Sequence, residues 1–148
     1  MCTAIKINYE DGCVMGRTMD YEVPLNYNAI YLPKNYNFCN DLMGNPLYSK
    51  YKTLGICFEN RDPLKDGVNE HGLIGITNAF SGFNLYANQV KPEKTNISSL
   101  DYFTYALTNY KSVEELIEDL PNIHISTKDY NGENVISPDF HLSLQIGC

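Results

Sequence analysis

The sequence lacks the features that mark several large classes of protein. It contains no tryptophan, and no apolar run approaches the roughly 20 residues that a membrane-spanning helix requires. Basic residues are few, 11 against 18 acidic ones, and the formal net charge is −7. We therefore expect neither nucleic acid nor an anionic membrane as a partner, because both bind basic surfaces. The start of the chain shows no basic segment followed by an apolar one, so we see no signal peptide and expect a cytoplasmic location.

Metal-binding patterns are missing as well. The five cysteines are odd in number and irregularly spaced, and no Cys-x-x-Cys pair occurs, which argues against a zinc site and a disulfide framework. The three histidines lie far apart and are interpreted as surface or packing residues. We expect no metal and no cofactor. Three cysteines are interpreted as buried or partly buried thiols: Cys13, Cys39 and Cys57.

What the chain does contain fits one folded domain over residues 1–148. This length is typical of a single domain, and such a domain buries roughly 68–70% of its unfolded surface without disulfides. Hydrophobic residues make up 43% of the chain and charged residues 20%, which excludes a disordered protein.

Short apolar segments in the first half predict strands. The segment "TAIKINYEDGCVMGRTM" predicts a hairpin that turns at Asp11-Gly12. Further strands are expected over residues 28–36, 52–59, 73–80 and 140–146. The segments 39–51 and 62–72 are rich in turn residues, and 84–96 is polar, so we expect loops and an exposed linker there.

The period of the apolar residues changes after the linker. Helical spacing over residues 97–108 predicts a helix, and Ser98 and Asp101 form an N-cap pattern at its entry. A second helix is expected from Ser112, which forms a capping box with Glu115, to the break at Pro121. Strands, then helices, then a final strand indicate an α+β fold.

The residues with the clearest chemistry stand at the start. Methionine is normally removed before a small residue, and Cys2 would then carry a thiol and a free α-amine. That amine titrates near roughly pH 7.7, so part of it is neutral and can accept the thiol proton. Asp20 could orient the ammonium and Arg17 could favour the thiolate. From spacing alone, an ordinary surface ion pair is the favoured interpretation of Arg17 and Asp20, and the active-site interpretation stays open beside it.

Several segments together resemble a known family over nearly the whole chain: "MCTAI", "GRTMDYE", "LPKNY", "DGVNEHGL" and "SVEELIEDLPN". They are similar to the choloylglycine hydrolase and penicillin V acylase family of N-terminal-nucleophile hydrolases. The resemblance implies an αββα sandwich that hydrolyses linear amides. It matches Cys2 to the nucleophile and Arg17 and Asp20 to the active-site Arg and Asp. It places a backbone oxyanion donor at Ala79, with Asn78 beside it.

The resemblance implies conjugated bile salts as the small-molecule amide substrate, with penicillin V or an N-acyl homoserine lactone as alternatives. Family members are longer and carry a further Asn and Arg in their second half. We therefore expect the N-terminal half of the fold, an incomplete sandwich that forms homo-oligomers or associates with a missing second half. A catalytically inactive fragment, and a binding domain that keeps Met1 in front of Cys2, are the remaining alternatives.

Three other features have simpler interpretations. Asn69 is expected to be a turn residue with local hydrogen bonds rather than a substrate contact. Asn96-Ile97-Ser98 has the glycosylation pattern but predicts no glycan without a secretory signal. Six tyrosines could line an apolar pocket or pack on sheet faces: Tyr21, Tyr27, Tyr31, Tyr36, Tyr48 and Tyr51.

Overall fold

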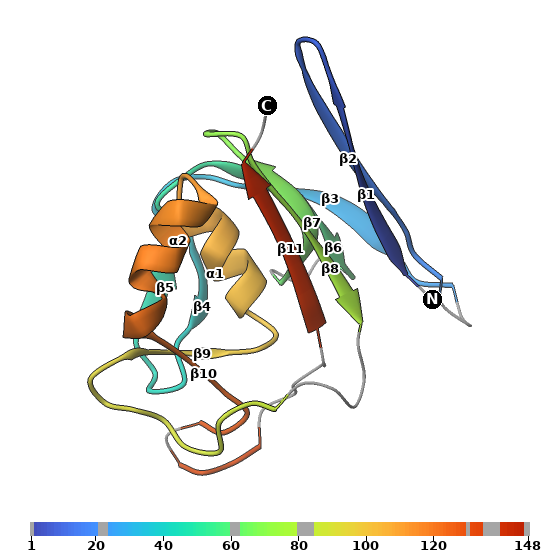
Figure 1. The fold of residues 1–148 in the computed structure, drawn as a ribbon. Helices are drawn as coiled ribbons and strands as arrows, with labels where there is room; N and C mark the ends of the chain where they lie inside the picture. Colours follow the sequence, from blue (N-terminus) through green and yellow to red (C-terminus); the bar gives the residue numbers. More distant parts are fainter. Residues whose placement is uncertain are drawn as a thin grey trace.

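The structure, a computed structural model, describes residues 2–20, 24–59, 63–79, 85–129, 131–134 and 140–146. Its centre is an antiparallel five-stranded sheet in the order β11-β8-β7-β6-β3 (Figure 1). The strands are β3 (Tyr27–Leu32), β6 (Thr53–Phe58), β7 (Leu64–Asn69), β8 (Leu73–Ala79) and β11 (Phe140–Ile146). The strand β11 therefore returns beside β8, although the helices separate the two in sequence.

Both α-helices lie on one face of this sheet (Figure 1). They are α1 (Tyr102–Asn109) and α2 (Val113–Asp119), followed by the short 3-10 helix η1 (Leu120–Asn122). Gly55, Gly67 and Gly75 lie side by side across β6, β7 and β8. A Cβ atom at Gly67 would lie 2.8 Å from Leu107 Cδ2, so α1 packs directly on this row of glycines. Among the described residues, no helix combines the length and the apolar composition that crossing a membrane requires.

Two smaller pairs of strands complete the described fold. The antiparallel pair is β4 (Asn37–Asn40) with β5 (Pro46–Tyr48), and the parallel pair is β9 (Thr95–Ser98) with β10 (Ile123–Ser126). Asp41 holds the turn between β4 and β5, because its Oδ1 accepts hydrogen bonds from the N–H groups of Met43 at 2.9 Å and Asn45 at 2.8 Å. Buried side chains of the helices and sheet form one core: Leu32, Leu64, Leu73, Ile97, Phe103, Leu107 and Leu116.

A separate hairpin, β1 (Thr3–Tyr9) and β2 (Gly12–Thr18), projects away from the central sheet (Figure 1). Alternation along the strands, with Ile7 opposite Val14, puts four apolar residues on one face. These side chains, Ile5, Ile7, Tyr9 and Val14, are 57% to 59% exposed. The other face carries Arg17, which contacts the central sheet. Part of the described structure is therefore an apolar ribbon face without cover, and a two-stranded ribbon is marginally stable by itself.

The expected α+β class is confirmed, as are most of the expected elements. The hairpin, the strands at 28–36, 52–59, 73–80 and 140–146, and the second helix are present with slightly different limits. Ser112 caps α2 as expected, since its Oγ accepts a hydrogen bond from the N–H of Glu115 at 3.3 Å. The carboxylate of Glu115 returns to the N–H of Lys111 at 2.6 Å, which completes a variant of the capping box.

Two of the expected loops are wrong. Segment 39–51 contains the end of β4 and all of β5, and segment 62–72 contains β7, the central strand of the main sheet. The sequence of β7, LKDGVN, has the composition of a turn because of its Lys, Asp and Gly residues. Tertiary contacts explain that composition. Gly67 leaves room for α1, and Asp66 binds Arg17 of the hairpin.

The first helix begins later than expected. Ile97 is fully buried in β9, and α1 starts at Tyr102. Ser98 organises the intervening turn rather than capping the helix. Its Oγ accepts from the N–H of Asp101 at 3.2 Å and donates to Asp101 Oδ2 at 2.6 Å. The linker expected over 84–96 runs into β9, and its partner β10 was not expected to be a strand.

Asn96, the acceptor position of the glycosylation pattern, is fully buried in this fold. Its Nδ2 donates to the carbonyl groups of Lys91 at 2.7 Å and Lys94 at 2.8 Å. Its Oδ1 accepts from the N–H of Lys91 at 2.7 Å. The amide of Asn96 therefore holds the loop before β9 and is not available to a glycosylating enzyme.

Candidate active site

Arg17 joins the hairpin to the central sheet. Its side chain is only 7% exposed, and its Nε lies 3.1 Å from Oδ2 and 3.0 Å from Oδ1 of Asp66 on β7. Its Nη1 donates to the backbone carbonyl of Thr77 on β8. Arg17 is therefore buried against the sheet and is not half of an exposed ion pair with Asp20. The alternative of an ordinary surface pair does not describe this structure.

Burial dominates the electrostatics around this contact. It raises the pKa of Asp66, although the neighbouring Arg17 guanidinium acts in the opposite direction. Burial also lowers the pKa of Lys65, the residue before Asp66, and the positive charge of Arg17 adds to that effect. The side chain of Asp66 is 24% exposed, so it provides a partly desolvated carboxylate that faces the guanidinium.

Asn78 and Ala79 stand at the end of β8, directly after Thr77. The register pairs Asp66 with Ile76, and alternation then places Asn78 on the same face of the sheet as Asp66. The Oδ1 atom of Asn78 is buried and has no hydrogen-bond partner among the described residues. A buried, unpaired amide oxygen is uncommon in a folded protein, so this position has unused hydrogen-bonding capacity.

Cys2 directly precedes β1 and is a partly buried free thiol. The N–H of Thr3 donates to Thr18 Oγ1 at 3.0 Å, so strand pairing extends to the residue beside Cys2. Ala4 is the register partner of Arg17, which puts Cys2 two residues from that partner along the strand. At such diagonal positions a long side chain reaches its neighbour.

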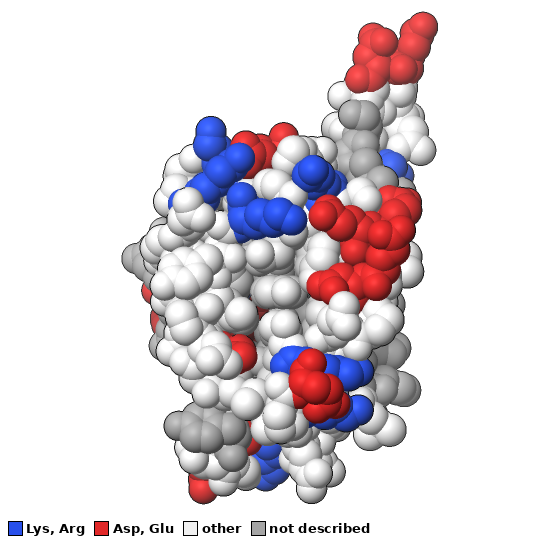
Figure 2. Space-filling view, turned by 90° about the vertical axis from the view of Figure 1, so that its left-hand side faces the viewer, with Lys and Arg blue, Asp and Glu red and all other residues white. Residues whose placement is uncertain are grey.

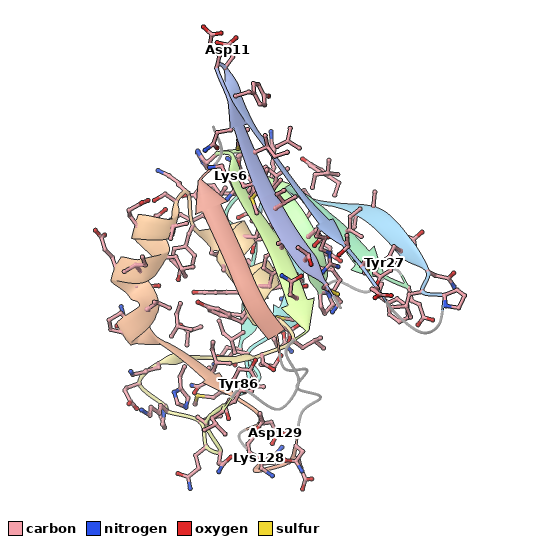
Figure 3. All side chains as sticks on the ribbon, turned by 45° about the vertical axis from the view of Figure 1, so that its right-hand side comes forward. Lys6, Asp11, Tyr27, Tyr86, Lys128 and Asp129 are labelled. Atoms are coloured by element: carbon pink, nitrogen blue, oxygen red, sulfur yellow. The ribbon has the colours of Figure 1, made fainter. Side chains whose placement is uncertain are left out.

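Asp20 lies just beyond β2 and is exposed. A hydrogen bond from the ammonium group of the chain terminus, and its positive charge, lower the pKa of Asp20. The fold therefore brings Asp20 to the amino end of the chain, where Cys2 follows. In Figure 3 Asp11 marks the distant tip of the hairpin and Lys6 its middle, so these site residues belong to the end opposite the tip.

A cavity of about 220 Å³ lies between β2 and the central sheet, next to the Arg17–Asp66 contact. Its walls are mainly apolar: Met15, Gly16, Val68, Ile74, Gly75 and Ile76. Ligand pockets usually measure about 300–1,000 Å³, so this cavity alone does not define a substrate pocket.

Sequence reasoning missed Asp66 and Thr77, the two residues that hold Arg17. The cause is the expectation of a loop over 62–72. The pairing of β6 with β7 shifts register between Leu64 and Asp66, so β7 does not alternate regularly there and its sequence gives no simple strand signal.

Asn69 is the last residue of β7, and its side chain makes the expected local hydrogen bonds to the turn that follows. Its Oδ1 accepts from the N–H groups of His71 at 2.9 Å and Leu73 at 3.1 Å. Its Nδ2 also donates to the carbonyl groups of Leu107 at 2.9 Å and Tyr110 at 2.7 Å. The buried amide of Asn69 therefore joins the turn after β7 to the end of α1.

The remaining singled-out residues include one disulfide-bonded cysteine, two free cysteines and a histidine that packs on a tyrosine. Cys13 is disulfide-bonded, so the expectation of a thiol there is wrong, whereas Cys39 and Cys57 are free. Within the described ranges, no group of three His, Cys, Asp or Glu side chains is placed to hold a metal ion. His71 packs edge-on against Tyr51, with ring centroids 4.5 Å apart.

The described tyrosines of the predicted set occupy different environments. Tyr31 and Tyr48 are 56% and 53% exposed, Tyr51 is 6% exposed, and Tyr27 packs edge-on against Phe58. Tyr21 lies outside the described residues.

Comparison with known proteins agrees with the sequence motifs. Residues 2–145 match the model of the linear amide C-N hydrolases, choloylglycine hydrolase family. A bile salt hydrolase/transferase of Clostridium perfringens is 34% identical over 128 residues, which cover 84% of this chain and 39% of that protein. A bile salt hydrolase/transferase of Bifidobacterium longum is 22% identical over 137 residues, which cover 90% of this chain and 43% of that protein.

Solved structures show the same relationship. A mutant of conjugated bile acid hydrolase from Clostridium perfringens superposes with a TM-score of 0.83 and 30% identity over 99% of this chain and 45% of the other. Penicillin V acylase from Agrobacterium tumefaciens gives a TM-score of 0.70 at 19% identity, over 98% of this chain and 43% of the other. These neighbours confirm the expected N-terminal-nucleophile hydrolase fold in partial form, and the chain spans less than half the length of these relatives. The chain belongs to the choloylglycine hydrolase family of linear amide C–N hydrolases.

Proposed function

We propose that residues 1–148 form part of a hydrolase domain that cleaves linear amides with Cys2 as its nucleophile. The observation that carries the proposal is the buried position of Arg17. It is fixed between Asp66 and Thr77, next to the start of the strand that follows Cys2. A guanidinium held at such a place favours the thiolate form of a nearby cysteine.

The proposed reaction begins after removal of Met1. The Cys2 amine, oriented by Asp20, accepts the thiol proton, and the thiolate sulfur attacks the amide carbonyl carbon. As the C–S bond forms, the carbonyl electron pair moves to oxygen, where the backbone N–H of Ala79, beside Asn78, stabilises the negative charge. The C–N bond then breaks, and the leaving amine takes the proton from the Cys2 ammonium. Water attacks the thioester, releases the acid and restores the thiol.

Conjugated bile salts are the substrates that we propose first. The support is the similarity of this chain to bile salt hydrolases, at 34% identity for the Clostridium perfringens protein. Penicillin V is the second candidate, supported by the likeness to the Agrobacterium tumefaciens acylase, which at 19% identity concerns the fold. The first candidate therefore has the support of sequence identity, and the second has the support of the fold.

We also propose that the hairpin associates with further polypeptide, either a second copy or a chain equivalent to the rest of the longer relatives. The support is the exposed apolar face formed by Ile5, Ile7, Tyr9 and Val14. Acidic side chains gather at the projecting tip (Figure 2), where Glu10 and Asp11 form the turn. An apolar face with an acidic tip suits another protein surface better than an anionic one.

The test measures hydrolysis and processing on the same preparation. Intact mass determines whether Met1 is removed, and release of glycine from glycocholate measures turnover, for the chain alone and with the remaining part of the Clostridium perfringens enzyme added as a separate polypeptide. We expect turnover that Cys2→Ala abolishes and that Cys39→Ala, a change at another free thiol, leaves intact. A processed chain without turnover in both conditions would identify an inactive member of the family, and retained Met1 would exclude the proposed nucleophile.

A further inference from the structure

Asp66 stands out among the residues around the candidate site because sequence reasoning assigned it no role. We propose that Asp66 is a positioning residue, which holds the Arg17 guanidinium and through it sets the reactivity of the Cys2 thiol. The proposal rests on the proposed function, since it concerns the same cysteine. Its evidence is the ion pair between Arg17 and Asp66, which attaches the hairpin to the central sheet.

The contact is made from a strand that does not belong to the hairpin. Asp66 lies on β7, 49 residues along the chain from Arg17, and both of its carboxylate oxygens lie within 3.1 Å of Arg17 Nε. The backbone carbonyl of Thr77 accepts from Nη1 of the same guanidinium. The guanidinium is thus held by one charged and one neutral acceptor, on two neighbouring strands.

Burial makes the carboxylate necessary. The Arg17 side chain is 7% exposed, and a buried positive charge without a counter-charge is strongly unfavourable. Without the negative charge of Asp66, the long and flexible Arg17 side chain is expected to turn toward solvent. The carbonyl of Thr77 alone does not neutralise that charge. Asp66 therefore determines where the positive charge of Arg17 lies.

The same contact joins the two parts of the proposed site. Cys2 begins the hairpin, whereas Asn78 and Ala79 end β8, directly after Thr77. By binding Asp66 and Thr77 together, Arg17 holds the hairpin against the strand of the proposed oxyanion donor. A loss of this contact changes both the charge near Cys2 and the attachment of the hairpin.

Several charged groups surround this contact on the described elements. Lys6 shares the inner face of the hairpin with Arg17, and Lys65 precedes Asp66 on β7. Asp20 lies beyond β2, beside the amino end of the chain. Asp66 is the carboxylate that pairs with Arg17, so its removal leaves the guanidinium beside the positive charge of Lys65, whose repulsion favours the turn of Arg17 toward solvent.

The test follows alkylation of Cys2 by iodoacetamide as a function of pH, on the full chain, with the Cys2 peptide measured by mass spectrometry. The variants are Asp66→Asn, Arg17→Gln and the double variant. Glu70→Gln is the matched control. Its carboxylate is 26% exposed and pairs with Lys34 at 2.9 Å, at the end of the same strand.

A positioning role has a specific signature. Asp66→Asn moves the midpoint of the alkylation profile upward by about 1 pH unit, so the reaction at lower pH slows about tenfold, the effect of losing a neighbouring opposite charge. Arg17→Gln has the same effect, the double variant is no slower than Arg17→Gln alone, and Glu70→Gln matches the unchanged chain.

Other results overturn the proposal. A downward shift in Asp66→Asn means that Asp66 only weakens the field of a guanidinium that stays in place. No shift, or additive effects of the two single variants, means that the residues do not act as a unit. If circular dichroism shows that Asp66→Asn is unfolded, Asp66→Glu is measured in its place. Slower alkylation of Cys2 in Asp66→Glu supports the positioning role, and an unchanged rate refutes it. Because alkylation needs no turnover, a chain that fails to hydrolyse glycocholate still tests the role of Asp66.

Discussion

Replacement of Gly67 by alanine tests how the helices are seated on the sheet that carries the candidate site. Gly67 lies between Gly55 and Gly75 in the row of glycines beneath α1. A Cβ atom there would lie 2.8 Å from Leu107 Cδ2 and 2.8 Å from the backbone oxygen of Leu54. The leucine side chain can rotate away, but the oxygen of Leu54 belongs to the neighbouring strand and cannot.

The size of the effect follows from these distances. Ordinary contact begins at 3.4 Å, so a strand must move by about 0.6 Å to admit the methyl group. Overpacking of this kind costs about 1–3 kcal/mol in the free energy of unfolding. For a chain of this size that corresponds to a decrease in melting temperature of roughly 2–12 °C.

Urea and thermal unfolding, followed by circular dichroism, measure this difference. Gly16→Ala is the control, because a Cβ at Gly16 meets nothing within 4 Å. Gly16 lies in a strand, so alanine there is expected to be neutral or stabilising by up to about 1 kcal/mol. Equal stability of Gly67→Ala and Gly16→Ala would refute the inference that α1 rests directly on the sheet.

Two further predictions concern the helical layer. Ser112→Ala removes the hydrogen bond that Ser112 Oγ accepts from the N–H of Glu115. It is expected to lower the free energy of unfolding, measured in urea, by about 0.5–2 kcal/mol, whereas Ser112→Gly lowers it by a few tenths. Equal losses in the two variants would contradict the capping role. Burial and the hydrogen bond to Asp119 raise the pKa of Tyr110 above its ordinary 10.0. The folded chain then holds this proton more tightly than the unfolded chain, so stability is complete below that value and decreases as the pH rises above it. Tyr110→Phe is therefore expected to flatten the stability profile between about pH 9 and about pH 11, and parallel profiles would exclude this contribution.

Local patterns predicted the elements whose signals lie within a few residues. The turn at Asp11-Gly12 and the capping pair Ser112 and Glu115 identified the first hairpin and the second helix. The central strand β7 was missed because its composition is explained only by its neighbours in space. Gly67 makes room for α1, which follows much later in the sequence, and Asp66 forms an ion pair with an arginine 49 residues away.

The residues of the candidate site also fall into two groups, those that sequence motifs identify and those that only the fold brings together. The resemblance to a family pointed to Cys2, Arg17 and Asp20, which lie close together in the sequence. The residues that hold Arg17 could not be found in this way, because a carboxylate partner and a backbone carbonyl leave no fixed spacing in a sequence. Only the antiparallel register of β7 and β8 brings Asp66 and Thr77 to the same guanidinium.

The candidate nucleophile thus directly precedes a hairpin whose outer apolar face is exposed in the described structure. A two-stranded ribbon with an exposed apolar face is marginally stable, whereas the strands that carry Asp66 and Asn78 are anchored by a buried core. Because Arg17 connects the two, the position of Cys2 relative to the end of β8 depends on how firmly the hairpin is held. Any polypeptide that covers the outer face of the hairpin would stabilise this arrangement without touching Cys2. Association and thiol reactivity are therefore expected to be thermodynamically coupled, each strengthening the other.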